Sequence, residues 1–378
     1  MKQYLFTAGP TPVPERVAVA MAKPILYHRA PAFSELFASV RAGLKEIFKT
    51  QNDVLVFAAT GTGGMESAIA NLFRRGDEVV FVNGGKFGER FGKIAQAYGL
   101  VAHAISVEWG TAVKVTQIEQ ALREHPKTRG VLVQASETST GVWHPIKDIA
   151  ALTRGREELA LVVDGVTAVG CTEIPMDEWG IDVLVAGSQK ALMLPPGLAF
   201  VGVGPKAWKM TESSDLPKFY FNWKKEREAQ NKNETAWTPA ISLIMGLQEV
   251  LTMIKEEGLD AVYARHKKLA RACREAAKAM HCQLLAADSP SDAVTAVKVP
   301  NGVDGSAIVK TLRNKYGITI AGGQDHLKGK IFRLAHLGYY SEMDILQVLS
   351  AVEMTLSELG HVFTPGAGVA AAMQVFRG

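Results

Sequence analysis

Seven short apolar runs between residues 53 and 204 constrain the fold of this 378-residue chain more than any other feature. Each run is rich in β-branched residues, and helical segments separate the runs. They read DVLVFAAT, EVVFVNGG, VAHAISV, GVLVQAS, LALVVDG, DVLVAGS and LAFVGVG. Such runs suit strands buried on both faces, and the intervening helices make the sheet mainly parallel. The sequence therefore predicts a three-layer α/β domain with a mainly parallel seven-stranded sheet.

The rest of the chain predicts a second, smaller unit. Between 205 and 239 the periodicity fails, and the polar stretch NWKKEREAQNKNETAWTP is typical of a solvated loop. Long helical patterns follow from residue 240. Residues 293–358 then give a strand, a helix, two strands and a closing helix, which fits a small α+β domain. The Gly- and Ala-rich tail after residue 360 is expected to pack weakly or fray.

Composition narrows the class of protein and its partners. The chain is 47% hydrophobic and 21% charged, with a net charge of +4 spread without a long basic block, so a nucleic-acid partner is not expected. The first residues hold no long apolar segment, so we expect a cytoplasmic protein with no membrane partner. Cys171, Cys273 and Cys282 show no C-x-x-C spacing, which argues against a disulfide framework or a zinc site, and no metal is expected.

Candidate ligand-binding residues follow several of the predicted strands, at the edge where parallel α/β sheets bind ligands. They are Thr60 to Gly64, Phe87, Ser139, Asp164 and Lys190. The stretch ATGTGGMESA follows a strand and opens a helix, so its N–H groups can converge on an anion. It is not a dinucleotide fingerprint, because Glu66 stands at the third glycine position, and it lacks the Walker lysine. The motif alone fits a phosphate cradle or a tight turn.

An acid and a lysine end two of these runs. Asp164 closes LALVVD, where a carboxylate is costly without a cation or several donors, although a helix N-cap is a common alternative. Lys190 follows an apolar run in VLVAGSQKALMLPPG, where it could also end a buried strand and reach solvent. Beside a phosphate cradle, the pair suggests pyridoxal phosphate: the lysine forms a Schiff base with the aldehyde, and the acid pairs with the pyridine nitrogen.

The chain resembles class V aminotransferases of fold type I, in particular the alanine–glyoxylate, serine–pyruvate and serine–glyoxylate group. The resemblance runs from TAGPTPVPERV to LRNKYGITIAGGQDHLKGKIFRLAHLGYYSEMDIL. Its most specific parts are ETSTGVWHPI, VVDGVTAVG, GSQKALMLPPG and GKIFRLAHLG. It implies a PLP-binding large domain over 21–255, a small C-terminal domain over 256–360, an N-terminal segment 1–20 lining the active site, and a tail over 361–378.

The resemblance also implies roles for individual residues. Lys190 and Asp164 would be catalytic, as the cofactor-binding lysine and the partner of the ring nitrogen. The other cofactor contacts would come from a phosphate loop, a stacking ring and neighbouring polar groups. These are Thr62, Gly63, Gly64, Phe87, Ser139 and Gln189.

Further roles concern the substrate and a second subunit. Arg333 in KIFRLAHLG would grip the substrate carboxylate, which its planar fork suits, and Gly9 would line the substrate pocket. Thr235 and Thr238 in ETAWTPA would reach the cofactor phosphate of the partner in a homodimer with shared active sites.

The implied activity is a ping-pong amino transfer from a small amino acid, with alanine or serine favoured, to glyoxylate or pyruvate. One alternative is a transaminase acting on 2-aminoethylphosphonate and pyruvate. A PLP lyase or desulfurase is another, although such desulfurases need a mobile cysteine and usually stack a histidine where Phe87 stands here. The third is a non-catalytic partner subunit that keeps the fold.

Overall fold

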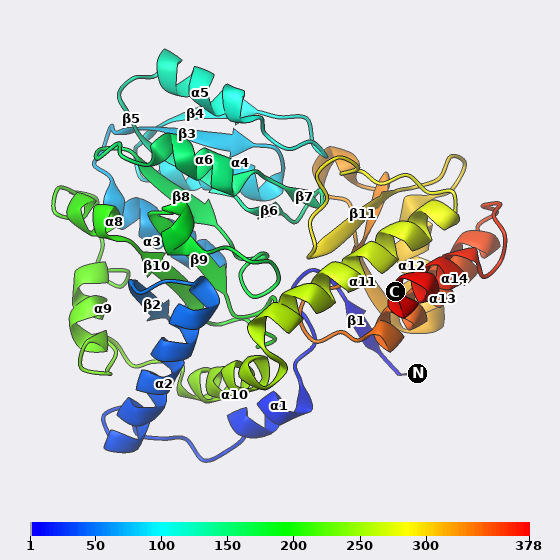
Figure 1. Cartoon of the computed structure of the whole chain (residues 1–378), viewed down its shortest axis with the longest axis horizontal. Helices are drawn as coiled ribbons and strands as arrows, with labels where there is room; N and C mark the ends of the chain where they lie inside the picture. Colours follow the sequence, from blue (N-terminus) through cyan, green and yellow to red (C-terminus); the bar gives the residue numbers. More distant parts are fainter. Residues whose placement is uncertain (1) are drawn as a thin grey trace.

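The large sheet of the computed structural model, which describes residues 2–378, contains all seven predicted strands (Figure 1). Their order is β2-β10-β9-β8-β5-β3-β4, and only β10 runs antiparallel to its neighbours. The bounds are Asp53–Phe57 (β2), Glu78–Asn83 (β3), Val101–Ser106 (β4), Thr128–Gln134 (β5), Ala160–Asp164 (β8), Val183–Gly187 (β9) and Ala199–Val203 (β10). The predicted seven-stranded, mainly parallel sheet is confirmed.

Helices cover both faces of this sheet, which explains why its strands lack polar alternation. Val80 and Val82 of β3 face one apolar core, and Val79 and Phe81 face the other. The first core includes residues of α2 (Pro31–Phe48), α5 (Val115–Glu124), α6 (Ile146–Thr153), α7 (Met176–Trp179) and α10 (Ile241–Glu257). The second includes residues of α3 (Gly61–Leu72), α4 (Lys86–Ala97), α8 (Pro205–Met210) and α9 (Trp223–Gln230). The three-layer prediction is confirmed.

A second sheet has the order β1-β12-β13-β11. The bounds are Tyr4–Phe6 (β1), Ile318–Gly322 (β12), Ile331–Ala335 (β13) and Val294–Lys298 (β11). Its core includes residues of α11 (Leu259–Ala279), α12 (Gly305–Tyr316) and α13 (Glu342–Glu358). The N-terminal strand β1 pairs in parallel with β12, so the blue start of the chain lies beside the C-terminal unit in Figure 1. The expected boundaries at residues 20, 255 and 360 stay predictions.

The C-terminal tail is an ordered helix, so the expectation that it packs weakly or frays was wrong. Helix α14 (Ala367–Arg377) packs on α11 and α13 and buries Gly368 and Ala372. The carboxylate of Glu353 accepts hydrogen bonds from the N–H groups of Gly366, Gly368 and Val369. This carboxylate satisfies donors that the first turn of a helix leaves free, and it anchors the tail.

The expectation of a solvated loop at NWKKEREAQNKNETAWTP was also wrong, because this stretch contains helix α9. Asn222 caps the helix by accepting the N–H of Lys225. Trp223 is fully buried, and its indole N–H donates to Ser67 Oγ at 3.1 Å. Glu226 is buried as well and accepts the N–H of Ala236. The sequence interpretation missed this helix because most of its residues are polar and only one of its faces is buried.

No helix within residues 2–378 combines the length and apolar character needed to cross a membrane.

The remaining short elements are helix α1 (Glu15–Met21), the 3₁₀ helix η1 (Asp325–Leu327) and the hairpin of β6 (Ser136–Glu137) and β7 (Val142–Trp143). The hairpin follows the carboxyl end of β5, at the edge of the large sheet where the candidate site lies.

Candidate active site

A cavity of about 230 Å³ lies at the carboxyl ends of the large-sheet strands. The N-terminal segment, the start of α3, the first turns of α4 and the ends of β5, β8 and β9 all contribute to it. Its lining residues are Gly9, Thr60, Gly61, Thr62, Met65, Phe87, Arg90, Ser136, Thr138, Asp164, Val166, Thr167, Gln189 and Lys190. The structure thus brings Gly9, Thr62, Phe87, Asp164, Gln189 and Lys190 of the predicted site together.

Lys190 lies in a buried turn directly after β9. Its backbone carbonyl accepts hydrogen bonds from the hydroxyl of Thr11 at 2.8 Å and the N–H of Met193 at 3.0 Å. Its ammonium donates to the carbonyl of Ala8. Burial lowers the pKa of Lys190 to about 8, and the charge of Asp164 opposes this effect. Near neutral pH a larger fraction of Lys190 than of an exposed lysine is therefore the uncharged, nucleophilic amine.

Asp164 is the last residue of β8 and is buried. One carboxylate oxygen accepts the N–H of Val166 at 3.0 Å. Burial raises the pKa of Asp164 to about 6, and the positive charges of Lys190 and Arg90 act against this rise. Within residues 2–378 no cation lies at salt-bridge distance from Asp164, so a protonated ring nitrogen of a ligand would supply the missing partner.

The start of α3 faces the cavity with free backbone donors. Thr60 is the N-cap residue, and its side chain makes no capping hydrogen bond. Gly61 and Thr62 line the cavity. Gly63 and Gly64 do not line the cavity. A Cβ atom added at Gly63 would lie 2.9 Å from Ala59 Cβ, and one added at Gly64 would lie 2.7 Å from Val185 Cγ1. The two glycines therefore allow close packing of α3, while the first turn presents N–H groups suited to a phosphate.

An arginine that sequence reasoning missed joins this helix start to the aromatic residue of the site. The guanidinium of Arg90 lies 4.8 Å from the centroid of the Phe87 ring and donates to the hydroxyl of Thr62 at 3.1 Å. The only signal in the sequence was the position of Arg90 one turn after Phe87 in KFGER. Arg90 adds positive charge beside the helix start, which favours an anionic ligand there.

The serine of ETSTG does not line the cavity; its neighbour Thr138 does. Ser139 is fully buried, and both its hydroxyl and its N–H donate to the carboxylate of Glu137. The same carboxylate accepts the N–H groups of Phe87 at 3.1 Å and Gly88 at 3.0 Å. Glu137, also missed from the sequence, thus positions the first turn of α4 and the ring of Phe87.

Arg333 is a buried cation without an acidic partner among residues 2–378. It lies on β13, where Nη1 donates to the carbonyl of Thr138 at 2.8 Å and Nε to the carbonyl of Gly322 at 3.0 Å. Burial lowers its pKa, while the charge of Glu137 acts to raise it. Arg333 does not line the 230 Å³ cavity itself, but it contacts Thr138, which does. A buried guanidinium without an acidic partner is suited to bind the carboxylate of a ligand.

The residues of the cavity fit pyridoxal phosphate. Gln189 provides an independent sign of a ligand site, because its side-chain oxygen Oε1 is buried without a hydrogen-bond partner. The start of α3 fits a phosphate, Phe87 a flat ring, Asp164 a ring N–H and Lys190 an aldehyde.

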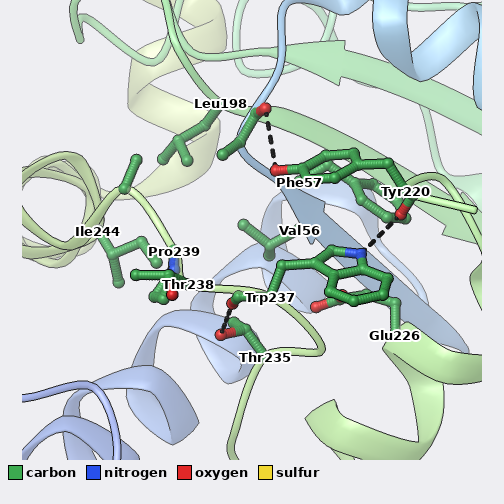
Figure 2. A pocket seen from close by; sticks show the side chains of 12 residues that line it. Val56, Phe57, Leu198, Tyr220, Glu226, Thr235, Trp237, Thr238, Pro239 and Ile244 are labelled. Carbon is green, nitrogen blue, oxygen red and sulfur yellow. Dashed lines mark hydrogen bonds between the residues drawn. The ribbon is translucent and has the colours of Figure 1, made fainter.

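Thr235 and Thr238 lie apart from this cavity (Figure 2). They line a separate small hollow with Tyr220, Glu226 and Trp237. The hydroxyl of Thr235 donates to the carbonyl of Trp237 at 2.7 Å, and the indole N–H of Trp237 donates to the carbonyl of Tyr220 at 2.9 Å. A single chain therefore does not bring these threonines to Lys190.

Replacing Gly9 by alanine is expected to displace Lys190 and lower turnover at this site at least about tenfold. Gly9 has φ +129°, and an added Cβ would overlap the end of the Lys190 side chain. Strain of this kind costs roughly 1 to 3 kcal/mol of stability. Steady-state rates and thermal unfolding test this. Gly155→Ala is the matched control, because Gly155 also has positive φ, +78°, but nothing lies within 4 Å of its added Cβ. Wild-type activity in Gly9→Ala would show that Gly9 does not hold Lys190 in place.

Comparison with known proteins agrees with this geometry. A family model described as aminotransferase class V matches residues 3–337. The small subunit of a soluble hydrogenase from Synechococcus sp. (strain PCC 6716) is 45% identical, covering 99% of this chain and 98% of its own length. The serine–glyoxylate aminotransferase of Methylorubrum extorquens is 37% identical, covering 100% of this chain and 96% of its own.

A solved structure agrees over the whole chain. The ureidoglycine–glyoxylate aminotransferase of Bacillus subtilis superimposes with a TM-score of 0.94 at 29% identity, covering 100% of this chain and 99% of that one. Family, fold and cavity thus coincide, and the chain belongs to the class V aminotransferases, pyridoxal-phosphate-dependent transaminases of fold type I.

Proposed function

We propose that the cavity around Lys190 transfers the amino group of a small amino acid, alanine or serine, to a 2-oxo acid, glyoxylate or pyruvate. The observation that carries this proposal is the buried Lys190, partly uncharged at neutral pH, beside the buried Asp164. The names of the serine–glyoxylate and ureidoglycine–glyoxylate relatives support glyoxylate as the acceptor. The two names differ in the amino donor, so the donor screen described below is needed to identify the donor of this protein.

In this proposal each residue has a distinct task. Pyridoxal phosphate, when bound, supplies an aldehyde for amine exchange and a ring that accepts electrons. Lys190 Nζ would hold the cofactor through its aldehyde and, once free, would take the proton from the substrate α-carbon. The Asp164 carboxylate would keep a proton at the ring nitrogen. The N–H groups at the start of α3 and the hydroxyl of Thr62 would bind the phosphate, Gln189 would contact the cofactor, and Phe87 would limit tilting of the ring.

In this proposal Arg333, the buried cation of the second sheet, binds the substrate. Arg333 would hold the substrate α-carboxylate, since its guanidinium has no acidic partner in residues 2–378 and contacts the cavity residue Thr138. Gly9 lines the same cavity as Lys190 and would border the bound substrate there. Because both half-reactions use this one site, we expect ping-pong kinetics.

We also infer a homodimer in which Thr235 and Thr238 reach the partner's cofactor phosphate. Supporting this, both threonines lie outside the cavity of their own chain. The neighbouring Phe219 is 72% exposed and stacks on Trp237 with ring centroids 5.0 Å apart, which leaves an aromatic surface uncovered.

A desulfurase is less well supported. That reaction needs a mobile thiolate near the substrate, whereas Cys171, Cys273 and Cys282 are all buried, and burial raises the pKa of each thiol. None of the three lines the cavity. Phe87 also occupies the position where such enzymes were expected to stack a histidine.

The rate at which the cofactor-free protein captures added pyridoxal phosphate is expected to rise with pH through about 8. Only the uncharged amine of Lys190 attacks an aldehyde. Burial lowers the pKa of this amine below the value of about 10.4 for an exposed lysine. Raising the pH through this window therefore increases the reactive fraction. Stopped-flow absorbance measures the capture rate. A midpoint near that of an exposed lysine would contradict the buried, partly uncharged Lys190.

A donor screen tests the proposed activity. The holoenzyme is mixed with alanine, serine, aspartate or 2-aminoethylphosphonate, and the loss of its visible absorbance is followed before glyoxylate or pyruvate is added. We expect alanine or serine to bleach the protein fastest and glyoxylate or pyruvate to restore the colour. Preference for 2-aminoethylphosphonate would support the phosphonate alternative. A colored protein that no donor bleaches would favour a non-catalytic partner role, as the hydrogenase-subunit name of one relative would allow.

A further inference from the structure

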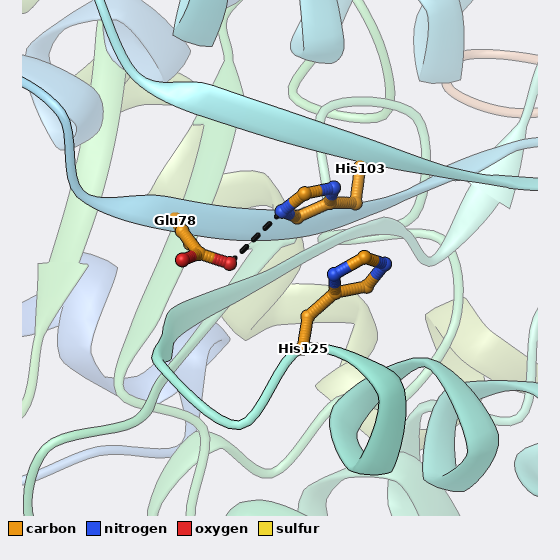
Figure 3. Close-up of side chains that lie close together, drawn as sticks. All are labelled: Glu78, His103 and His125. Carbon is orange, nitrogen blue, oxygen red and sulfur yellow. Dashed lines mark hydrogen bonds and ion pairs between the residues drawn. The ribbon is translucent and has the colours of Figure 1, made fainter.

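Two histidines and a glutamate converge on the large sheet away from the Lys190 cavity (Figure 3). Glu78 is the first residue of β3, and His103 lies on the edge strand β4. The parallel register pairs Val80 with His103, so Glu78, two residues before Val80, points to the same face of the sheet as His103. His125 directly follows α5, the helix that packs against this face. The chain thus brings three potential ligands together from three separate elements.

The side chains already lie close to one another. His103 Nε2 is 3.0 Å from Glu78 Oε2. The rings of His103 and His125 are nearly parallel, 9° apart, with centroids separated by 3.5 Å, as Figure 3 shows. One ligand atom from each of the three residues lies within 4.8 Å of the other two. The turn that carries His125 is fixed, because Thr128 donates both its N–H and its hydroxyl to the His125 carbonyl.

A hydrogen bond between His103 and Glu78 explains only part of this arrangement. The imidazole of His125 has no hydrogen-bond partner anywhere in residues 2–378, although it is half-buried against His103. Two imidazoles in contact repel each other when both carry a proton. A shared cation would satisfy both rings and the carboxylate at once.

The ligand set matches a borderline divalent cation. Zinc prefers imidazole nitrogen and carboxylate oxygen at about 2.0 to 2.2 Å, which places neighbouring ligands of a tetrahedral ion about 3.3 Å apart. The spacing of 3.0 Å between His103 and Glu78 is near this value, and the three ligand atoms lie within 4.8 Å of one another. Because an imidazole binds a metal in its ring plane, the stacked ring of His125 must rotate to turn a nitrogen toward an ion shared with His103. The side chains of His103 and Glu78 are 25% and 26% exposed, so water can complete the coordination.

We propose that Glu78, His103 and His125 bind one Zn²⁺ ion per chain, which fastens the edge strand β4 and the end of α5 to β3. The site begins at the amino end of β3, whereas the Lys190 cavity lies at the carboxyl ends of the strands. It is therefore a stabilising site separate from amino transfer. No local motif predicts this site, because the two histidines are 22 positions apart and the prediction of no metal rested on cysteine spacing.

Zinc titration of the chelator-treated holoenzyme tests the site. Bound zinc is measured by competition with a colorimetric chelator for the wild type and for His103→Gln, His125→Gln and Glu78→Gln. We expect one ion per wild-type chain at micromolar zinc or below, and at least about tenfold weaker binding in each ligand variant. His326→Gln is the matched control, because His326 is an exposed imidazole outside the cluster, and its affinity should equal that of the wild type.

Thermal unfolding provides the second measurement. Zinc should raise the unfolding midpoint of the wild type and of His326→Gln, and leave the ligand variants unchanged. Unfolding of the metal-free variants and their visible cofactor absorbance verify that each is folded. A wild type that binds no zinc at micromolar concentration, or a folded His125→Gln protein that binds it equally well, would overturn the proposal. Neither result depends on whether the transaminase proposal is correct.

Discussion

Replacing Lys190 by alanine is expected to lower transamination by at least about 10³-fold, because the variant loses the group proposed to move the α-proton. It should also lose the lysine-dependent visible absorbance. The fold should survive, since the change removes a buried amine whose burial disfavours its charged form. Steady-state rates, absorbance spectra and thermal unfolding measure these effects. Some cofactor should still bind through the start of α3, Thr62 and Gln189.

Lys218→Ala is a matched control for this variant. Lys218 is partly buried, burial lowers its pKa as it does for Lys190, and its ammonium donates to Ser214 and the Leu216 carbonyl outside the cavity. The control should keep its activity and its colour. A Lys190→Ala protein that retained a tenth or more of wild-type turnover would remove Lys190 from the proposed chemistry.

Replacing Arg333 by glutamine is expected to lower kcat/KM for amino acids by on the order of 10² to 10³. Losing one partner of a buried charge pair costs roughly 2 to 5 kcal/mol, and each 1.4 kcal/mol is about tenfold in rate. Arg333→Lys keeps the charge but not the planar fork, so it should recover only part of the loss. Initial-rate kinetics with a carboxylate donor measure both variants.

Arg333 also donates to the carbonyls of Thr138 and Gly322, so a structural effect must be separated from substrate binding. Reaction of the holoenzyme with a simple amine that lacks a carboxylate provides this separation. If Arg333 holds the substrate carboxylate, Arg333→Gln should react with that amine as the wild type does. An equal loss for both kinds of amine would assign Arg333 a structural role instead.

The sequence predicts the large sheet well, because a strand buried on both faces requires a continuous run of apolar residues. A strand such as β3 must be apolar at Val79, Val80, Phe81 and Val82, since alternate side chains enter different cores. Local patterns carry less information about long-range pairing. Strand β1 has only three residues, and its pairing with β12 spans most of the chain, so no local signal revealed it.

Within the site, the sequence predicted the strand-end residues more reliably than those in turns. Asp164 ends one buried strand and Lys190 follows another, and their placement is fixed by strand length. In ETSTG, a shift of one position decides whether Thr138 or Ser139 faces the cavity, and that depends on the hydrogen bonds of Glu137. Arg90 was missed because its role arises only when α4 packs beside the start of α3.

Chemical trapping tests the central claim most directly. Borohydride reduction of the holoenzyme fixes an aldehyde cofactor to the lysine that holds it, and peptide mass mapping then identifies that lysine. The account predicts one cofactor adduct per chain, on the peptide that contains Lys190, and none in Lys190→Ala. An adduct on a different lysine, or a coloured wild-type protein without any adduct, would contradict it.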